Sequence, residues 1–462
     1  MRTNNRHLIR LSAIPVLLGL SASAYAQAIK LPPVTRTTLD NGIRIILMEY
    51  HKAPTITVNA QFPGGTSTDP ADKAGVASLT ADLLRKGTDS RSAQQIAEAI
   101  DFLGGSLGAG AGDDRFSVGL GVQSKDTDAG LDLFTDIIRR PTLLDTELDR
   151  ERQLTIAGLE AIGEDPGTVV RRVSRETVFA GHPYGVDSTI TSLKSITRDD
   201  LMAYYKRFIV PDHMIIVAVG DFKTADMLAK LKAKFGDWPK ANSEPVAVPA
   251  VKANPRKVVV IDKPDATQTQ VRWVRMAYPR KSPDYFAGDI ASSILGGGFT
   301  SRLIDEIRVN RSLTYSIGSG FGTLLHGGQF GVSTFTKIET TKAIIDATQD
   351  VLKRTANQGV TAKELNKVKG YMAGQFAIAM QTPEAIAGEL GEMEFYKLPN
   401  NYLETYITHL NAITLAEANR IAKTYFDPSQ LSLVLVTPHA KVQAQLKSLG
   451  AYDKHPVSEV GK

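Results

Sequence analysis

The spacing of apolar residues changes within residues 300–321, and this change predicts a helix followed by a strand. The expected helix positions are Leu303, Ile304 and Ile307, and the expected strand positions are Leu313, Tyr315, Ile317, Ser319 and Phe321. The change of period falls after Ser312. Arg308 and Tyr315 are therefore expected to lie together on one side of a helix-to-strand corner.

Two interpretations of this corner are open from the segment alone. Arg308 can simply complement the negative end of the helix, with Tyr315 as a half-buried packing residue. Alternatively, the cation and the phenol form a functional pair that faces a ligand. The rest of the chain has to decide between them.

Other periodic segments indicate an α+β protein. In the first half, strands are expected at residues 44–47 and 55–62, and a buried helix at residues 73–88. Long helices are expected at residues 142–163 and 361–380. Because strand runs and helices are mixed in both halves, we predict antiparallel sheets with helices packed on one face.

The two halves repeat one pattern at a constant offset of 217 residues, which indicates two homologous domains. The matches are Glu147-Leu148 with Glu364-Leu365, Pro166 with Pro383, Ile196-Thr197 with Ile413-Thr414, Pro211 with Pro428, and 216–219 with 433–436. Residues 238–255 contain four prolines and few large apolar side chains, which is typical of a linker. The sequence thus predicts domains at residues 30–237 and 256–462.

Residues 1–26 have the pattern of a secretory signal peptide. Arg2, Arg6 and Arg10 precede the apolar run 11–20, and residues 24–26 read Ala-Tyr-Ala. Cleavage is expected before Gln27, which predicts a periplasmic mature protein. No other stretch is continuously apolar over the length needed to span a membrane.

Charge and cysteine content exclude two classes of function. Removing the three signal-peptide arginines lowers the net charge from +5 to +2, and no block rich in lysine and arginine follows, so nucleic acid is not an expected partner. The chain has no cysteine, so it can use neither thiolate catalysis nor thiolate metal ligands.

A resemblance to the pitrilysin/insulinase metallopeptidase family starts around the helix at residues 73–88. Residues 75–77 (Gly-Val-Ala) and 86–88 (Lys-Gly-Thr) resemble the flanks of that family's inverted zinc motif, His-x-x-Glu-His, which is followed about 75 residues later by a third ligand. The matching positions here are Ser78, Ala81, Asp82 and Gly158. The resemblance therefore implies no zinc and no other cofactor in this chain. Asp82 remains as a lone carboxylate.

The second half keeps a different part of the family pattern. Residues 295–303 resemble the family's second-domain glycine turn, and residues 307–316 resemble its Leu-Arg-Glu-x-Arg-Gly-Leu-x-Tyr-Ser segment, with Val309 and Ser312 among the departures. In the family, this arginine and tyrosine reach the substrate at the zinc. The resemblance thus implies that Arg308 and Tyr315 bind the substrate carbonyl and stabilise the tetrahedral intermediate.

Bacterial members of this family divide the two parts between a zinc-bearing subunit and an Arg/Tyr-bearing subunit. The resemblance identifies this chain as the second kind: inactive alone, and paired with a homologous subunit that holds the zinc and with a peptide substrate. The non-catalytic subunit of mitochondrial processing peptidase is similar but has a longer glycine-rich loop, so presequence recognition is not implied. The main alternative is a catalytically retired periplasmic peptide-binding or scaffold protein. An active peptidase with an improvised metal site is disfavoured by the missing ligands.

Overall fold

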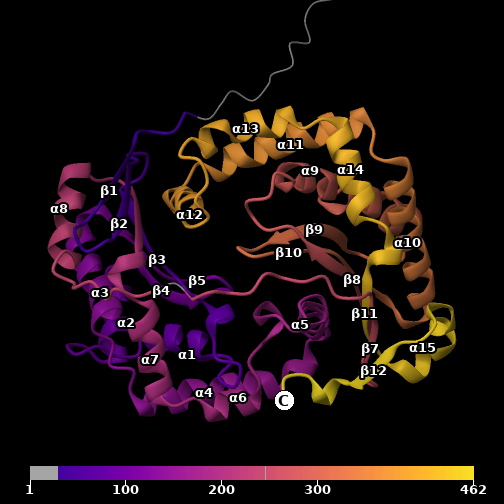
Figure 1. Cartoon of the computed structure of the whole chain (residues 1–462), viewed down its shortest axis with the longest axis horizontal. Coiled ribbons are helices and arrows are strands. Elements are labelled where there is room, and N and C mark those ends of the chain that lie inside the picture. Colours follow the sequence, from indigo (N-terminus) through magenta and orange to yellow (C-terminus); the bar gives the residue numbers. More distant parts are fainter. Residues whose placement is uncertain (1–29, 245) are drawn as a thin grey trace, which may run out of the picture.

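The computed structural model describes residues 30–244 and 246–462. The expected signal peptide lies outside these ranges. Each half of the chain builds one six-stranded sheet with helices, and the two halves stand at opposite sides of a broad molecule (Figure 1). Within the described ranges, no helix has the length and apolar character needed to cross a bilayer.

The sheet of the first half has the strand order β1-β2-β6-β3-β5-β4. The strands are β1 (Val34–Thr38), β2 (Arg44–Glu49), β3 (Thr55–Pro63), β4 (Ser106–Ala111), β5 (Arg115–Gln123) and β6 (Ile215–Gly220). Every residue of β6 is buried, as its continuous apolar sequence IIVAVG predicts for a central strand covered on both faces. β2 and β6 run parallel, and the other neighbours are antiparallel.

The sheet of the second half has the order β12-β7-β11-β8-β10-β9. Its strands are β7 (Val258–Asp262), β8 (Gln268–Ala277), β9 (Ile317–Thr323), β10 (Gly328–Lys337), β11 (Ser432–Thr437) and β12 (Asp453–Pro456). Five strands match the first sheet in order, and the sixth differs: β1 forms an antiparallel hairpin with β2, whereas β12 joins β7 in parallel. The α+β class is therefore confirmed, but both sheets are mixed rather than antiparallel.

Most helices cover the sheet of their own half. The helices of the first half are α1 (Val76–Leu83), α2 (Ala93–Phe102), α3 (Thr127–Arg139), α4 (Asp145–Glu160), α5 (Pro166–Val178), α6 (Ile190–Ser195), α7 (Arg198–Phe208) and α8 (Thr224–Phe235). Those of the second half are α9 (Tyr285–Gly296), α10 (Thr341–Gln358), α11 (Ala362–Ala379), α12 (Pro383–Phe395), α13 (Tyr402–Ala412), α14 (Leu415–Tyr425) and α15 (His439–Leu446). The bounds of α5 and α12, like those of α7 and α14, lie 217 residues apart.

Two helices are exchanged between the halves. α12 packs on β3 and β6 of the first sheet, and α5 packs on β8 and β11 of the second (Figure 1). Both begin in the same way, with a side-chain cap at Asp165 or Thr382 followed by proline at the first helical position. The prediction of helices on one sheet face is thus wrong, because each second face is covered by a helix from the other half.

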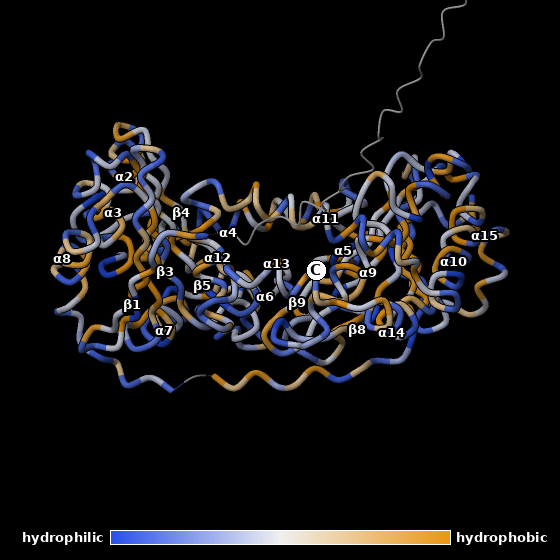
Figure 2. The backbone as a smooth tube through the Cα atoms, turned by 90° about the horizontal axis from the view of Figure 1, so that it is seen from above, coloured by the Kyte–Doolittle hydropathy of each residue, from blue (hydrophilic) through white to orange (hydrophobic). Residues whose placement is uncertain are grey.

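Residues 238–255 connect the halves along one side of the molecule (Figure 2). Both ends of this connection are tied to the folded body. The Asp212 carboxylate accepts the backbone N–H of Ala241 at 2.7 Å, and the His182 ring lies 2.8 Å from the Pro249 carbonyl oxygen. The linker therefore follows the surface rather than hanging free at these points.

Candidate functional site

The corner that carries Arg308 and Tyr315 differs in detail from the expected helix and strand. α9 ends at Gly296, a glycine turn follows, and Arg308 lies in a π-helical segment, η6 (Ile304–Asn310). Ile304 and Ile307 are buried, as their spacing predicts. The strand begins only at Ile317, because the Leu313 N–H bonds back to the Ile307 carbonyl (3.0 Å) and prolongs the turn. Single π-helical turns are frequent at functional sites.

The loop around Tyr315 is anchored to a buried strand. Two β10 hydroxyls hold the backbone on either side of it: Thr336 donates to the Leu313 carbonyl at 2.6 Å, and Thr334 donates to the Ser316 carbonyl at 2.9 Å. Both threonines are buried. A functional side chain mounted on a rigid strand in this way keeps its geometry better than one on a free loop.

Arg308 and Tyr315 meet in space. The guanidinium carbon of Arg308 lies 4.5 Å from the Tyr315 ring centroid and 5.8 Å from that of Phe299, within the range of cation–π attraction. Tyr315 is 74% exposed and Phe299 is 81% exposed. Tyr315 is therefore not a packing residue, and the arginine is held between two exposed rings.

The neighbouring acidic side chains are already engaged by other arginines. Glu364 accepts two bonds from Arg302 at 2.7 and 2.8 Å, and Glu306 accepts one from Arg311 at 2.8 Å. Arg308 is instead positioned by aromatic faces. Such a contact leaves the N–H donors at the edge of a guanidinium available for an acceptor, such as a peptide carbonyl.

Ser312 adopts the left-handed backbone conformation, with φ of +53°. This is the position where the resembling family carries glycine, and the backbone conformation explains that preference because glycine has no Cβ. We expect Ser312→Gly to raise the free energy of unfolding by up to about 1 kcal/mol, since relief of strain exceeds the added freedom of the unfolded chain.

Thermal melting measures this effect, with Ser316→Gly as the matched control. Ser316 has no such positive φ, so glycine there should destabilise the protein. A Ser312→Gly protein that melts no higher than wild type would contradict the argument from strain.

The positions that match the family's zinc motif lie on α1 and α4, which pack against each other. Ser78, Ala81 and Asp82 are on α1, with Ala81 fully inside the core, and Gly158 is on α4. Asp82 is the only charged donor among the four. Across the described ranges, no three His, Cys, Asp or Glu side chains are placed to hold a metal ion. These residues do not fit a catalytic zinc.

A lysine lies where these helices bring carboxylates together. Lys86 contacts the Glu151 carboxylate at 2.6 Å, and Glu151 is close enough to Asp82 to influence its ionisation. Burial raises the pKa of Asp82, and the negative charge of Glu151 raises it further. The Lys86 ammonium acts in the opposite direction, so a side-chain cation compensates this carboxylate pair.

Sequence reasoning missed Phe299, Thr334 and Thr336. Phe299 follows three glycines, and a large exposed aromatic residue after such a turn is a usable signal for a binding surface. The threonines gave no signal, because threonine is common in strands and only the structure shows which carbonyls they bind.

The chain matches two family descriptions in succession. Residues 44–190 match "Insulinase (Peptidase family M16)", and residues 195–372 match "Peptidase M16 inactive domain". Among solved structures, the "peptidase M16 inactive domain" of Pseudomonas fluorescens superposes with a TM-score of 0.82 at 26% identity, covering 88% of this chain and 98% of the other.

Three curated relatives match along most of their length. An uncharacterized zinc protease of Mycobacterium tuberculosis is 26% identical over 84% of this chain and 90% of its own. A Helicobacter pylori protein described as a non-peptidase homolog is 24% identical over 93% and 98%. A probable mitochondrial-processing peptidase subunit beta of Arabidopsis thaliana is 23% identical over 88% and 79%.

Proposed function

The chain belongs to the insulinase family, peptidase family M16, and on that premise we propose that it is the non-catalytic subunit of a periplasmic heterodimeric zinc metalloendopeptidase. One observation carries the proposal. An exposed, rigidly mounted Arg308–Tyr315 pair accompanies a first domain whose motif positions lack the donors for zinc. The signal-peptide pattern of residues 1–26 supports the periplasmic location.

In this role, the pair acts on the peptide that the zinc-bearing partner hydrolyses. The Tyr315 hydroxyl donates a hydrogen bond to the substrate oxygen as it gains negative charge in the tetrahedral intermediate. One preorganised donor of this kind is worth about 2.7–4 kcal/mol. The Arg308 guanidinium holds a neighbouring carbonyl of the peptide. Neither group is suited to activate water at neutral pH, since an arginine stays protonated and a phenol is a weak base.

A second candidate is a peptide-binding or scaffold protein that kept the shell of the family and lost its chemistry. The missing donors at Ser78, Ala81, Asp82 and Gly158 favour it equally, as does the non-peptidase description of the Helicobacter pylori relative. The two candidates differ in one requirement: only the subunit role needs a zinc-bearing homologue bound to this chain.

The purified mature chain is expected to bind no stoichiometric zinc and to cleave no peptide. The reason is that its motif positions offer one carboxylate where the family uses three ligands and a base. Metal analysis by mass spectrometry and a mixed fluorogenic peptide library measure both properties, with a zinc-bearing M16 peptidase as the positive control. One tightly held zinc per chain, together with chelator-sensitive cleavage, would sink the proposal.

A further inference from the structure

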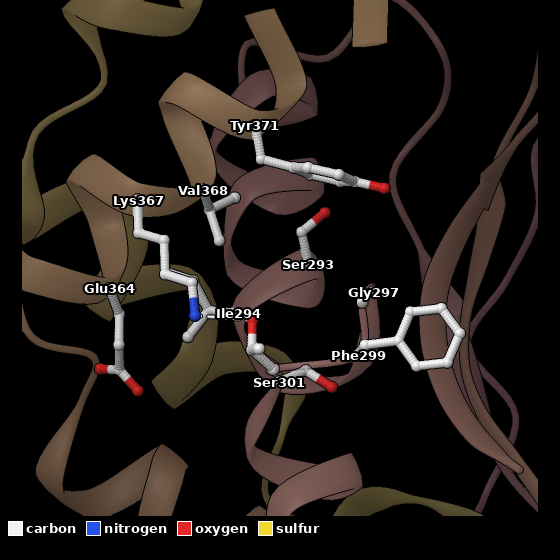
Figure 3. Close-up of a pocket in the computed structure, with 11 residues that line it drawn as sticks. Ser293, Ile294, Gly297, Phe299, Ser301, Glu364, Lys367, Val368 and Tyr371 are labelled. Carbon is white, nitrogen blue, oxygen red and sulfur yellow. Dashed lines mark hydrogen bonds between the residues drawn. The ribbon is translucent and has the colours of Figure 1, made fainter. Parts of the chain in front are cut away.

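A pocket of about 230 Å³ lies beside the Arg308–Tyr315 pair, between the end of α9, the glycine turn and α11. Figure 3 shows Val368 and Tyr371 on α11 facing Ile294 on α9, with Phe299 at the side of the turn. These four side chains form its apolar wall. We call it the α9–α11 pocket.

The charged groups at this pocket are compensated within the chain. Glu364 is bound by Arg302 through two hydrogen bonds, and the Lys367 ammonium donates to the Thr300 hydroxyl at 2.6 Å. Burial alone opposes ionisation of Glu364, but the bonds from Arg302 and Thr361 outweigh it and lower its pKa to about 2. The surface that remains for a ligand is the apolar wall.

The pocket is continuous with the pair through one side chain. The Phe299 ring lines the pocket and also contacts the Arg308 guanidinium. A peptide whose carbonyl accepts bonds from Arg308 therefore passes along Phe299. One of its nearby side chains then reaches the mouth of the pocket, where Tyr371 is 53% exposed.

From this arrangement we infer that the α9–α11 pocket binds one aliphatic or aromatic side chain of the peptide held by Arg308. Its volume is below the roughly 300–1,000 Å³ of pockets that enclose whole small-molecule ligands, so it suits a single side chain. The inference rests on the proposed function, and it gives this subunit a part in selecting the substrate.

Ligand-observed NMR on the isolated mature chain tests the pocket without activity or a partner. The probes are acetylated Gly-X-Gly amides at millimolar concentration, with X as Ala, Leu, Phe, Lys or Glu. The Leu and Phe peptides should bind about tenfold more tightly than the Ala peptide, and the Lys and Glu peptides no more tightly than Ala. Tyr371→Ser should abolish this preference. Ile378→Ser, an exposed apolar position on the same helix outside the pocket, should preserve it.

Absence of the Leu and Phe preference in the wild-type chain, or its survival in both Tyr371→Ser and Val368→Asp, would overturn the inference. So would preferential binding of the charged peptides. Arg308→Ala separates the pocket from the proposed function. If all affinities fall while the apolar preference persists, both are supported. If no affinity changes and the preference persists, the pocket stands and the role of Arg308 falls. Thermal melting confirms that each variant is folded.

Discussion

Replacing Tyr315 with phenylalanine is expected to lower the kcat of the complex with a zinc-bearing partner by roughly a hundredfold to a thousandfold. The change removes one hydroxyl and leaves the ring that contacts Arg308. Because the hydrogen bond strengthens only as the substrate oxygen gains charge, the KM should change far less than kcat. Steady-state kinetics of the reconstituted complex measure both constants.

Arg308→Ala should behave differently in the same assay. A ground-state carbonyl already accepts bonds from the guanidinium, so its loss should raise KM as well as lower kcat. Tyr315 is largely exposed, so both variants should melt at the wild-type temperature. An intact complex that shows wild-type kinetics with Tyr315→Phe would contradict the assignment of the pair.

The second large effect is expected at the exchanged helices. Leu390 on α12 is 2% exposed and packs in one cluster with Ile215, Val217 and Val219 of β6, which belongs to the other half of the chain. Leu390→Ala should therefore lower the free energy of unfolding by about 2–5 kcal/mol. Hydrogen exchange should locate the lost protection in β3 and β6, more than 150 residues earlier in the sequence.

Leu154→Ala is the matched control, because it makes the same chemical change at an exposed position on α4. Its effect should stay within about 0.5 kcal/mol. If Leu390→Ala loosened only the second half of the chain, with β3 and β6 fully protected, α12 would not be the cover of the first sheet.

The repeat and the fold class could be predicted from the sequence because they depend on local pattern. Capped helix starts at Asp165 and Thr382, with the proline after each, occur in both halves and fixed the register. The exchange of α5 and α12 could not be predicted. An apolar stripe such as Val169, Val170 and Val173 shows that a helix is buried, but not which sheet buries it.

The candidate site was predicted in its residues and missed in its setting. Arg308 and Tyr315 were identified by a family pattern, since a cation near a phenol is otherwise unremarkable in sequence. Their contact, the exposure of Tyr315 and the positive φ of Ser312 depend on a prolonged turn, which the alternating pattern after Ser312 concealed. The α9–α11 pocket joins residues about 70 positions apart, and no local pattern reports such a junction.

The most direct test of the subunit role is affinity capture of the tagged mature chain from the periplasm of its own source, with three readouts on the eluate. We expect mass spectrometry to find a homologous chain of similar size with an intact His-x-x-Glu-His motif. Metal analysis should give one zinc per pair, and peptide cleavage should be chelator-sensitive and absent from either chain alone. Recovery of this chain without such a homologue, or a homologue whose zinc-dependent cleavage is as fast without this chain as with it, would contradict the account.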